Sequence, residues 1–280
     1  MFHRIVVDAD SLLYRCGFAA EGEPVSHACH NLKLQIQSIK EALGTDNAEL
    51  YIKGKGNFRK DIAVSCTYKG TRTMRVPTHY PALRDYIKEV HGAKEVDGME
   101  ADDICSAILF EYSDRESGVV VAAMDKDLWN TPGWHFNYDP RKWTTSYVTI
   151  AEADYNFLFQ LVVGDRSDNV PGLPRLAQAS VERLGVEGVR SGGVAETKAK
   201  RILNSLNTNQ ERLEEIWTLY QEYGKEVEWS ESDVQDYFVE QGRLLWMTRR
   251  MHADGSPVLW EPPEGLLSKR LRSEDTGSSN

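Results

Sequence analysis

The segment Val119–Asp127, with the sequence Val-Val-Val-Ala-Ala-Met-Asp-Lys-Asp, indicates the fold most clearly. Residues 119–124 contain only Val, Ala and Met, which is typical of a strand buried on both faces of a sheet. Asp125 and Asp127 follow this strand directly. Because α/β sheets present their ligands at the carboxyl ends of their strands, the segment predicts a central strand that ends in two functional carboxylates.

The same pattern of an apolar run beside acidic residues occurs in three other places. These acids are Asp8 and Asp10 after Ile5–Val7, Glu100, Asp102 and Asp103 at the start of an amphipathic segment, and Asp165 and Asp168 after Leu161–Val163. Gathered carboxylates repel one another unless a cation neutralises them, and Mg²⁺ prefers oxygen ligands. Each group alone is also explained by a turn or by the helix dipole. Their recurrence in one chain predicts a divalent-metal site.

The apolar patterning predicts an α/β fold with a mostly parallel central sheet and flanking helices over residues 1–150. Strands are expected at residues 4–10, 50–52, 119–124, 134–138 and 146–149, and helices at 29–43, 80–91 and 100–113. From Ala151 onward the pattern becomes helical, with helices at 198–206, 209–224 and 232–248. Residues 151–265 are therefore expected to form a helical region, and the polar residues 266–280 a disordered tail.

The charge is distributed unevenly along the 280 residues, whose net charge is −10. Between residues 53 and 75 the chain has seven basic residues and one acid, namely Lys53, Lys55, Arg59, Lys60, Lys69, Arg72 and Arg75 against Asp61. A solvated surface loop explains this segment as well as a phosphate-binding arch does. An acidic pocket beside a basic loop is, however, what a metal-dependent nuclease needs.

Several features bear on the cellular location. No apolar run approaches the roughly 18 residues of a membrane span, and no signal peptide is recognisable. The four cysteines are scattered, as expected in a reducing cytoplasm, so the predicted location is cytoplasmic, or the host cytoplasm if a phage encodes the chain. His27, Cys29 and His30 lie close together, but their spacing fits none of the usual zinc patterns.

Five stretches resemble the 5′-nuclease family of flap endonucleases and 5′→3′ exonucleases, of the PIN-like superfamily and of phage or bacterial type. They are Val6–Arg15, Tyr68–Arg72, Glu100–Asp103, Asp125–Leu128 and Gly164–Gly172, in the order that the family has. The resemblance implies hydrolysis of phosphodiester bonds near DNA 5′ ends, with water activated by two Mg²⁺ or Mn²⁺ ions. DNA with a 5′ end or flap, or an RNA/DNA hybrid, would be the substrate, and no membrane or defined oligomer is implied.

The resemblance also implies a role for each acid. Asp8, Glu100 and Asp102 would hold the first metal, and Asp103, Asp125, Asp127, Asp165 and Asp168 would hold or surround the second. Lys69 and Arg72 would face the scissile phosphate from a basic arch over about residues 53–80. DNA contacts are expected from Arg15, Lys53, Lys55, Arg59 and Arg75.

A helix–hairpin–helix module follows the last acidic motif in this family, often with a monovalent cation such as K⁺. Residues 193–203 resemble its second half, where Gly193, Lys198 and Lys200 would hold a DNA phosphate near a helix N-terminus. About 20 residues, Leu173 to Gly192, separate the two halves here, where the family has a tight hairpin.

One position departs from the family pattern. The family usually has an aspartate at the end of the second strand, whereas Lys53 stands near that place and no acid lies between Glu49 and Phe58. Asp10 is an extra acid, so it either compensates for the missing one or the first metal site is weakened.

Three other interpretations stay open. A haloacid-dehalogenase-type phosphatase would use Asp8 as the nucleophile and Asp10 as the acid, but it leaves the later acidic motifs unexplained. A DNA-binding protein of the same fold that has lost cleavage is consistent with the missing acid. A PIN-type ribonuclease keeps the chemistry, although such ribonucleases are usually shorter.

Overall fold

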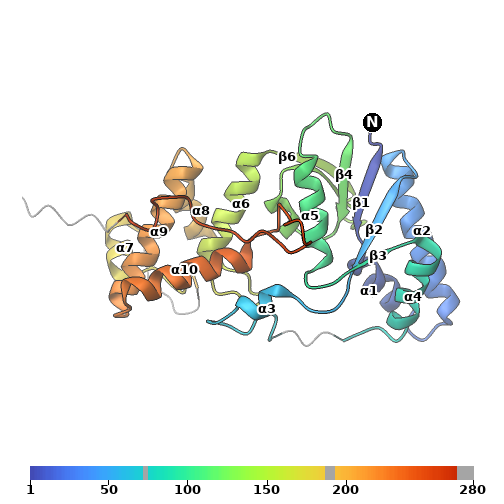
Figure 1. The fold of residues 1–280 in the computed structure, drawn as a ribbon, viewed down its shortest axis with the longest axis horizontal. Helices are drawn as coiled ribbons and strands as arrows, with labels where there is room; N and C mark the ends of the chain where they lie inside the picture. The colour runs from blue at the N-terminus through green and yellow to red at the C-terminus, as the bar shows by residue number, and fades with distance from the viewer. Residues whose placement is uncertain (72–74, 187–192, 270–280) are drawn as a thin grey trace, which may run out of the picture. The chain divides into compact units, whose positions relative to one another are not determined.

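The computed structural model describes residues 1–71, 75–186 and 193–269 (Figure 1). The chain divides into two compact units, neither of which is continuous in sequence. Unit 1 comprises Met1–Asp61, Arg72–Asn156 and Trp246–Leu259, and unit 2 comprises Ile62–Thr71, Phe157–Leu245 and Trp260–Asn280. The predicted boundary between a nuclease domain and a DNA-binding region, after residue 150, stays a prediction.

Unit 1 contains a six-stranded sheet in the order β3-β2-β1-β4-β5-β6. Its strands are β1 (Arg4–Asp8), β2 (Ala48–Lys53), β3 (Lys94–Val96), β4 (Val119–Ala123), β5 (Gly133–Asn137) and β6 (Thr144–Val148). All neighbouring pairs are parallel except β5 and β6. Every residue of β4 is buried, as its unbroken apolar sequence predicts for a central strand. The predicted mostly parallel sheet with flanking helices is confirmed.

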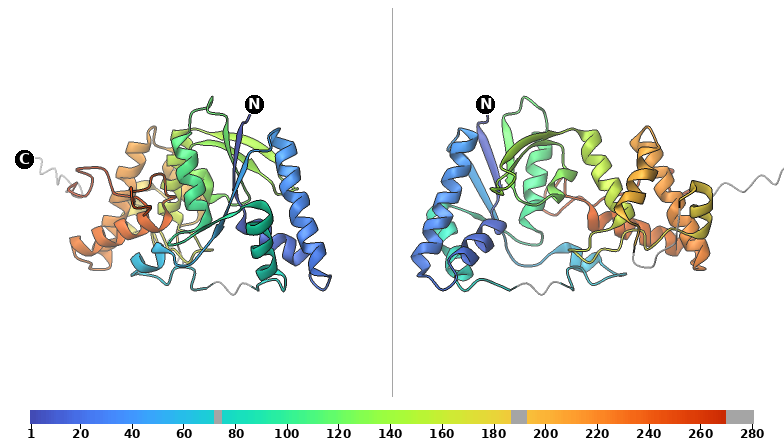
Figure 2. Two further views of the ribbon diagram at one scale, coloured as in Figure 1. Left: turned by 45° about the vertical axis from the view of Figure 1, so that its right-hand side comes forward. Right: turned by 180° about the vertical axis from the view of Figure 1, so that it is seen from behind.

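Helices cover both faces of this sheet (Figure 2). Ile5 and Val7 of β1 pack with α1 (Asp10–Ala19), α2 (Val25–Leu43) and α4 (Tyr80–His91). Val6, which points to the other face, packs with α5 (Ala101–Glu111). Because side chains alternate along a strand, one continuous apolar sequence supplies both cores.

Some elements differ from those that apolar periodicity predicts. Residues 10–19 form α1, and the basic segment includes the short helix α3 (Phe58–Ile62). The 3-10 helix η1 (Asp127–Asn130) follows β4. The predicted stop of α2 at Gly44 is confirmed: this glycine adopts φ 71°, which L side chains rarely adopt, and donates to two carbonyls of the last turn.

Unit 2 is helical, as predicted for the second part of the chain. It contains the second half of α6 (Ile150–Val163), together with α7 (Gln178–Leu184), α8 (Glu196–Asn204), α9 (Asn209–Glu226) and α10 (Glu231–Leu245). Trp217 and Tyr220 of α9 pack against Phe238 of α10, and the Tyr220 hydroxyl donates to the Leu161 carbonyl at 2.7 Å. Trp217 is 1% exposed, so it serves packing within unit 2.

The helix–hairpin–helix module stays a prediction. Helix α7 lies inside the insertion of residues 173–192, and residues 187–192 lie outside the described residues. Of the predicted tail, residues 270–280 also lie outside them. Within the described parts of the chain, no helix is both long and apolar enough to cross a bilayer.

Candidate metal centre

The carboxyl ends of the two central strands of unit 1 place acids side by side. Asp8 is the last residue of β1, Asp10 is the first residue of α1, and Asp125 follows β4. Since β1 and β4 are adjacent and parallel, their carboxyl ends lie at the same edge of the sheet. The start of α5 adds Glu100 and Asp102.

Asp8 shows most directly that these acids are neighbours. It is 6% exposed, and burial raises its pKa to about 8, with further increases from the charges of Asp10, Asp125 and Glu100. The pKa of Asp102 is also well above its ordinary value, first because of burial and then because of Glu100, Asp103 and Asp8. Burial and the neighbouring acids therefore disfavour the charged form of both side chains, and a bound cation would favour it. We call Asp8, Asp10, Glu100, Asp102 and Asp125 the carboxylate cluster.

One oxygen of the cluster is an unsatisfied buried acceptor. Asp102 Oδ1 is buried and has no hydrogen-bond partner among the described residues. A buried acceptor without a partner is rare in a folded protein and calls for an explanation such as a bound ion. Asp8, Asp102 and Asp125 offer the hard oxygen donors that Mg²⁺ and Mn²⁺ accept, so the residues fit a divalent ion in their chemistry.

The cluster is not a finished coordination sphere. Within the described residues, no three His, Cys, Asp or Glu side chains already converge closely enough to hold a metal ion. A divalent ion would therefore have to draw the carboxylates toward one another. Asp127 lies beside the cluster in sequence, where its N–H donates to Asp125 Oδ1 at 2.9 Å and its Oδ1 lies 3.1 Å from Lys126 Nζ.

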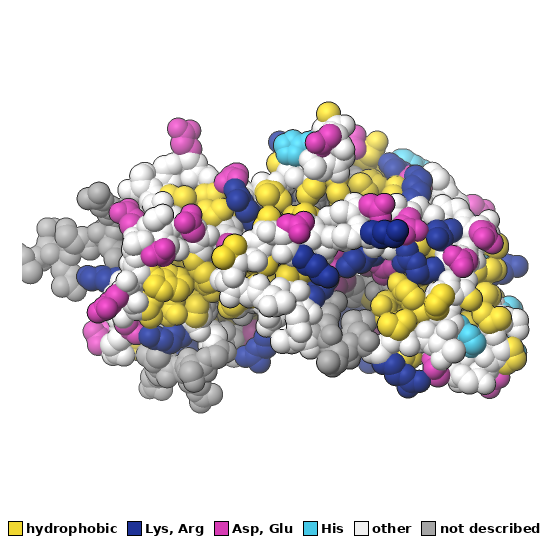
Figure 3. All heavy atoms as spheres, turned by 60° about the horizontal axis from the view of Figure 1, so that its bottom comes forward, with side chains coloured by type: hydrophobic (Ala, Val, Ile, Leu, Met, Phe, Trp, Pro, Cys, Tyr) yellow, Lys and Arg dark blue, Asp and Glu magenta, His cyan; other side chains and the backbone are white. Residues whose placement is uncertain are grey.

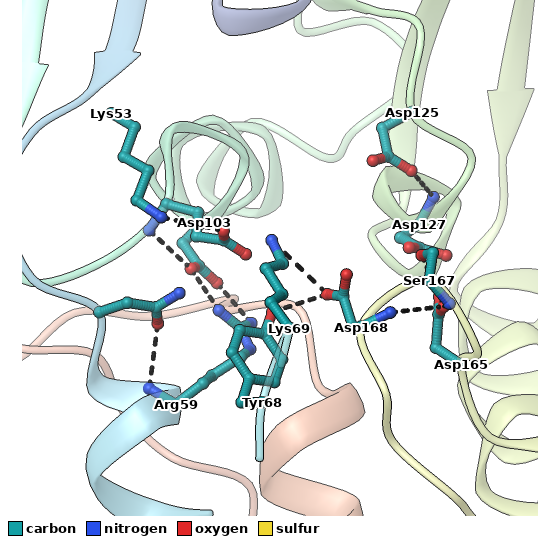
Figure 4. Close-up of polar contacts among 12 residues, drawn as sticks. Lys53, Arg59, Tyr68, Lys69, Asp103, Asp125, Asp127, Asp165, Ser167 and Asp168 are labelled. Carbon is teal, nitrogen blue, oxygen red and sulfur yellow. Dashed lines mark hydrogen bonds and ion pairs between the residues drawn. The ribbon is translucent and has the colours of Figure 1, made fainter. Parts of the chain in front are cut away.

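Asp103 has a different environment from that expected of a metal ligand. Its two oxygens accept from Arg59 Nη1 and Nη2 at 2.6 and 2.8 Å (Figure 4). Its Oδ1 also accepts from the Thr248 hydroxyl at 2.8 Å. The side chains of Asp103 and Arg59 are 0% and 3% exposed. This geometry argues against the predicted metal role of Asp103 and against the predicted DNA contact of Arg59, because both side chains are buried against each other.

Unit 2 brings together the remaining predicted acids and the predicted catalytic lysine. Asp165 Oδ1 accepts from the N–H and the hydroxyl of Ser167, both at 2.7 Å (Figure 4). Asp168 Oδ2 accepts from the Tyr68 hydroxyl at 2.7 Å and lies 3.6 Å from Lys69 Nζ. The Lys69 N–H also donates to the Asp168 carbonyl at 2.7 Å, so Lys69 is fixed at this loop. Arg72, the second predicted catalytic residue, lies outside the described residues.

The predicted DNA-binding residues have varied surroundings. In unit 1, Lys55 is exposed, Arg15 is half-buried with Nη1 4.0 Å from Met124 Sδ, and Arg75 pairs with Glu21 at 3.0 Å. In unit 2, the Gly193 N–H donates to the Pro174 carbonyl, Lys198 is half-buried in α8, and Lys200 is 3.9 Å from Glu196. Figure 3 shows basic side chains interspersed with acidic ones on one face, rather than a uniformly basic surface.

Two partners of the site were not predicted from the sequence. Thr248 is 145 residues away from Asp103, and Arg84 donates to the Lys53 carbonyl at 2.7 Å from α4. Neither residue lies in a motif or next to an acidic run, so the sequence contained no signal for them.

No family model matches the chain, but individual relatives do. The chain is 25% identical over 236 residues to DNA polymerase I of Bacillus caldotenax, covering 74% of this chain and 26% of the polymerase. It is 26% identical over 192 residues to a 5′-3′ exonuclease of Buchnera aphidicola, covering 61% of this chain and 66% of the exonuclease. The chain thus spans less than two thirds of the length of either relative.

Solved structures show the fold. The 5′-exonuclease of phage T5 with bound zinc ions superposes with a TM-score of 0.58 at 14% identity, covering 87% of this chain and 89% of that chain. The fold is that of the 5′-nucleases. A T5 flap endonuclease in a pseudo-enzyme-product complex with DNA and metal ions gives 0.55 at 15% identity, over 87% and 88%. The predicted resemblance to 5′-nucleases is confirmed.

Within this 5′-nuclease fold, the predicted departure at the end of β2 is visible. Lys53 Nζ lies 3.5 Å from Glu100 Oε1, and the Lys53 N–H donates to both oxygens of Asp10 at 3.2 and 3.0 Å. Asp10 therefore reaches the end of β2, where the missing acid would stand. Burial raises the pKa of Asp10, whereas Lys53 and Arg84 lower it.

Proposed function

We propose that this protein is a divalent-metal-dependent 5′-nuclease that hydrolyses phosphodiester bonds near DNA 5′ ends, as an exonuclease or a flap endonuclease. The observation that supports this most strongly is the buried Asp102 Oδ1, which lacks a partner among the described residues inside a cluster of mutually repelling acids. The 5′-3′ exonuclease relative and the shared 5′-nuclease fold add support.

The residues of unit 1 suggest which acids would hold metal. Asp8, Asp102 and Asp125 are the proposed ligands, and Asp10 and Glu100 lie next to them. Bound Mg²⁺ or Mn²⁺ would polarise the phosphodiester and lower the pKa of water. The carboxylates would orient the attacking water and the phosphate, because phosphoryl chemistry depends mainly on positioning and charge stabilisation.

Unit 2 would supply side chains that contact the phosphates of the DNA substrate or hold a second ion. Lys69 would place a positive charge at the scissile phosphate, and its position is set by Tyr68 and Asp168. Asp165 and Asp168 would serve a second ion, as the resemblance implies. Lys198 and Lys200, near the N-terminus of α8, would contact phosphates of the duplex.

Two alternatives are less well supported. The haloacid-dehalogenase interpretation would make Asp8 a nucleophile, but the fold matches that of the phage T5 5′-exonuclease, and this interpretation gives the later acidic motifs no role. A non-cleaving DNA-binding protein would not need an unsatisfied carboxylate oxygen at the cluster.

The test uses 5′-flap, nicked-duplex and single-stranded DNA, each labelled at its 3′ end. The purified protein is incubated with Mg²⁺, Mn²⁺ or EDTA, beside the variant Asp125→Ala/Asp127→Ala. Metal-dependent cutting near the 5′ end that is lost in the variant supports the proposal. Intact DNA in every lane, or cutting that persists in EDTA, contradicts it.

A further inference from the structure

Lys53 is attached to the carboxylate cluster by both its side chain and its backbone. Its Nζ, which points toward the start of α5 in Figure 4, lies 3.5 Å from Glu100 Oε1. Its N–H donates to both carboxylate oxygens of Asp10. Its carbonyl oxygen accepts from Arg84 Nη1 at 2.7 Å. The side chain is 34% exposed, so it lies at the border between the cluster and solvent. These contacts fix a positive charge at one side of the cluster.

Positive charge is distributed unevenly over the acids. Glu100 has the Lys53 ammonium, and Asp10 has the Lys53 N–H together with the nearby charge of Arg84. Asp8 and Asp102 form no ion pair with any Lys, Arg or His among the described residues. The buried Asp102 Oδ1 lacks even a hydrogen-bond donor there. Glu100 and Asp10 thus have groups of Lys53 in contact, whereas Asp8 and Asp102 have no cationic side chain in contact within the described parts of the chain. The charge of Arg59 lowers the pKa of Asp102, but by less than burial and the neighbouring acids raise it.

We propose that Lys53 is a built-in cation that engages Glu100 and Asp10 and leaves Asp8 and Asp102, together with Asp125, as the principal ligands of the divalent ion in unit 1. This inference rests on the proposed function and specifies how the same site binds metal. Lys53 is a positioning residue for the metal site, because it acts there through the acids.

The charge of Lys53 also affects the affinity of the carboxylate cluster for a divalent ion. An ammonium and a divalent cation near the same carboxylates repel each other, and they compete for Glu100. Lys53 therefore lowers the affinity of the cluster for a divalent ion. Its removal should release Glu100 as an additional ligand and strengthen binding, in contrast to the loss that usually follows removal of a residue around a metal site.

The experiment is calorimetric titration of the full chain with Mn²⁺ alone, without DNA. The variants are Lys53→Met and Lys53→Gln, which remove the charge, and Lys53→Arg, which keeps it. Lys60→Met is the matched control, because Lys60 is an exposed lysine of unit 1 and its substitution changes the net charge equally. The neutral Lys53 variants should bind Mn²⁺ on the order of tenfold more tightly. Lys53→Arg and Lys60→Met should resemble the wild type.

The inference is overturned if the neutral variants, folded by circular dichroism, bind Mn²⁺ with unchanged or lower affinity, or if Lys53→Arg behaves as they do. Binding that is absent in the wild type but present in Lys53→Met supports it. Absence of binding in all variants contradicts both this inference and the proposed function. Normal Mn²⁺ binding without any DNA cleavage contradicts the proposed function alone.

Discussion

Arg59 and Asp103 form a two-pronged ion pair inside unit 1, with nitrogen–oxygen distances of 2.6 and 2.8 Å. Both side chains are buried. Asp103 also accepts a hydrogen bond from the Thr248 hydroxyl, and Arg59 also donates one to the Trp246 carbonyl. The pair joins α3 and α5 to residues 246–248, which lie far away in sequence. One of the acids in the Glu-Ala-Asp-Asp motif is therefore structural.

Arg59→Met should destabilise the metal-free protein by about 3–5 kcal/mol, because it leaves the Asp103 charge buried without a partner. Arg59→Met/Asp103→Leu should recover part of this loss. The exposed pair of Arg75 and Glu21 offers the control, and Arg75→Met should cost about 1 kcal/mol or less. Urea denaturation in EDTA measures all three. An Arg59→Met protein as stable as the wild type would show that the buried pair contributes little.

Asp8→Asn should stabilise the metal-free protein at pH 8 but not at pH 4. The folded-state pKa of Asp8, about 8, is raised above the ordinary value of 3.8. The contribution of Asp8 to the free energy of unfolding is therefore fully present below about pH 4, where the group is protonated. It is lost as the pH rises toward 8. Asparagine cannot ionise, so the variant escapes this loss. Thermal unfolding in EDTA across this range measures the difference, and parallel pH profiles for the two proteins would disprove it.

Tyr68→Phe should lower the cleavage rate constant by about tenfold or more, since loss of the hydroxyl bond to Asp168 loosens the segment that holds Lys69. The Tyr68 side chain is buried, so the ring itself should keep its place. Tyr51→Phe makes the same chemical change where the hydroxyl donates to Glu49 on β2, and it should cleave like the wild type. Single-turnover kinetics compare the variants. Equal cleavage rate constants for all three proteins would show that the Tyr68 hydroxyl does not help to position Lys69.

Gly164→Ala should disrupt the loop that contains Asp165 and Asp168. Gly164 adopts φ 70°, and an added Cβ would lie 2.3 Å from the Val170 carbonyl oxygen. We expect a destabilisation of about 2 kcal/mol or more, because backbone atoms on both sides must move. Gly255→Ala has a similar positive φ but open space around the new Cβ, so it isolates the effect of backbone strain. Equal losses of stability in the two variants would show that the clash is relieved without cost.

The sequence predicted those strands and helices whose formation depends on the residue pattern of their own segment. The wholly apolar strand 119–123 and the helix 80–91, which ends at Gly92, appear in the structure where periodicity placed them. Helix α1 was not predicted from its pattern, because its start coincides with acids that were interpreted as ligands. Strand β3 has only three residues, two of them charged and exposed, so its sequence resembles a loop.

The acids were predicted as a set, but their individual roles depend on tertiary partners. Asp102 and Asp103 are adjacent in sequence, yet one has an unsatisfied oxygen and the other pairs with Arg59, 44 residues away. Likewise, the Lys53 contact with Glu100 spans 47 residues. Only the folded chain shows which carboxylates are already neutralised.

The most direct test of the central claim is single-turnover cleavage of 5′-flap DNA in Mg²⁺ by Asp102→Asn, combined with thermal unfolding of the same protein in EDTA. We predict that cleavage falls at least about a hundredfold, because a proposed ligand is lost, and that the unfolding temperature equals or exceeds that of the wild type. Cleavage at the wild-type rate by a folded Asp102→Asn protein would contradict the assignment of this carboxylate cluster as the metal centre.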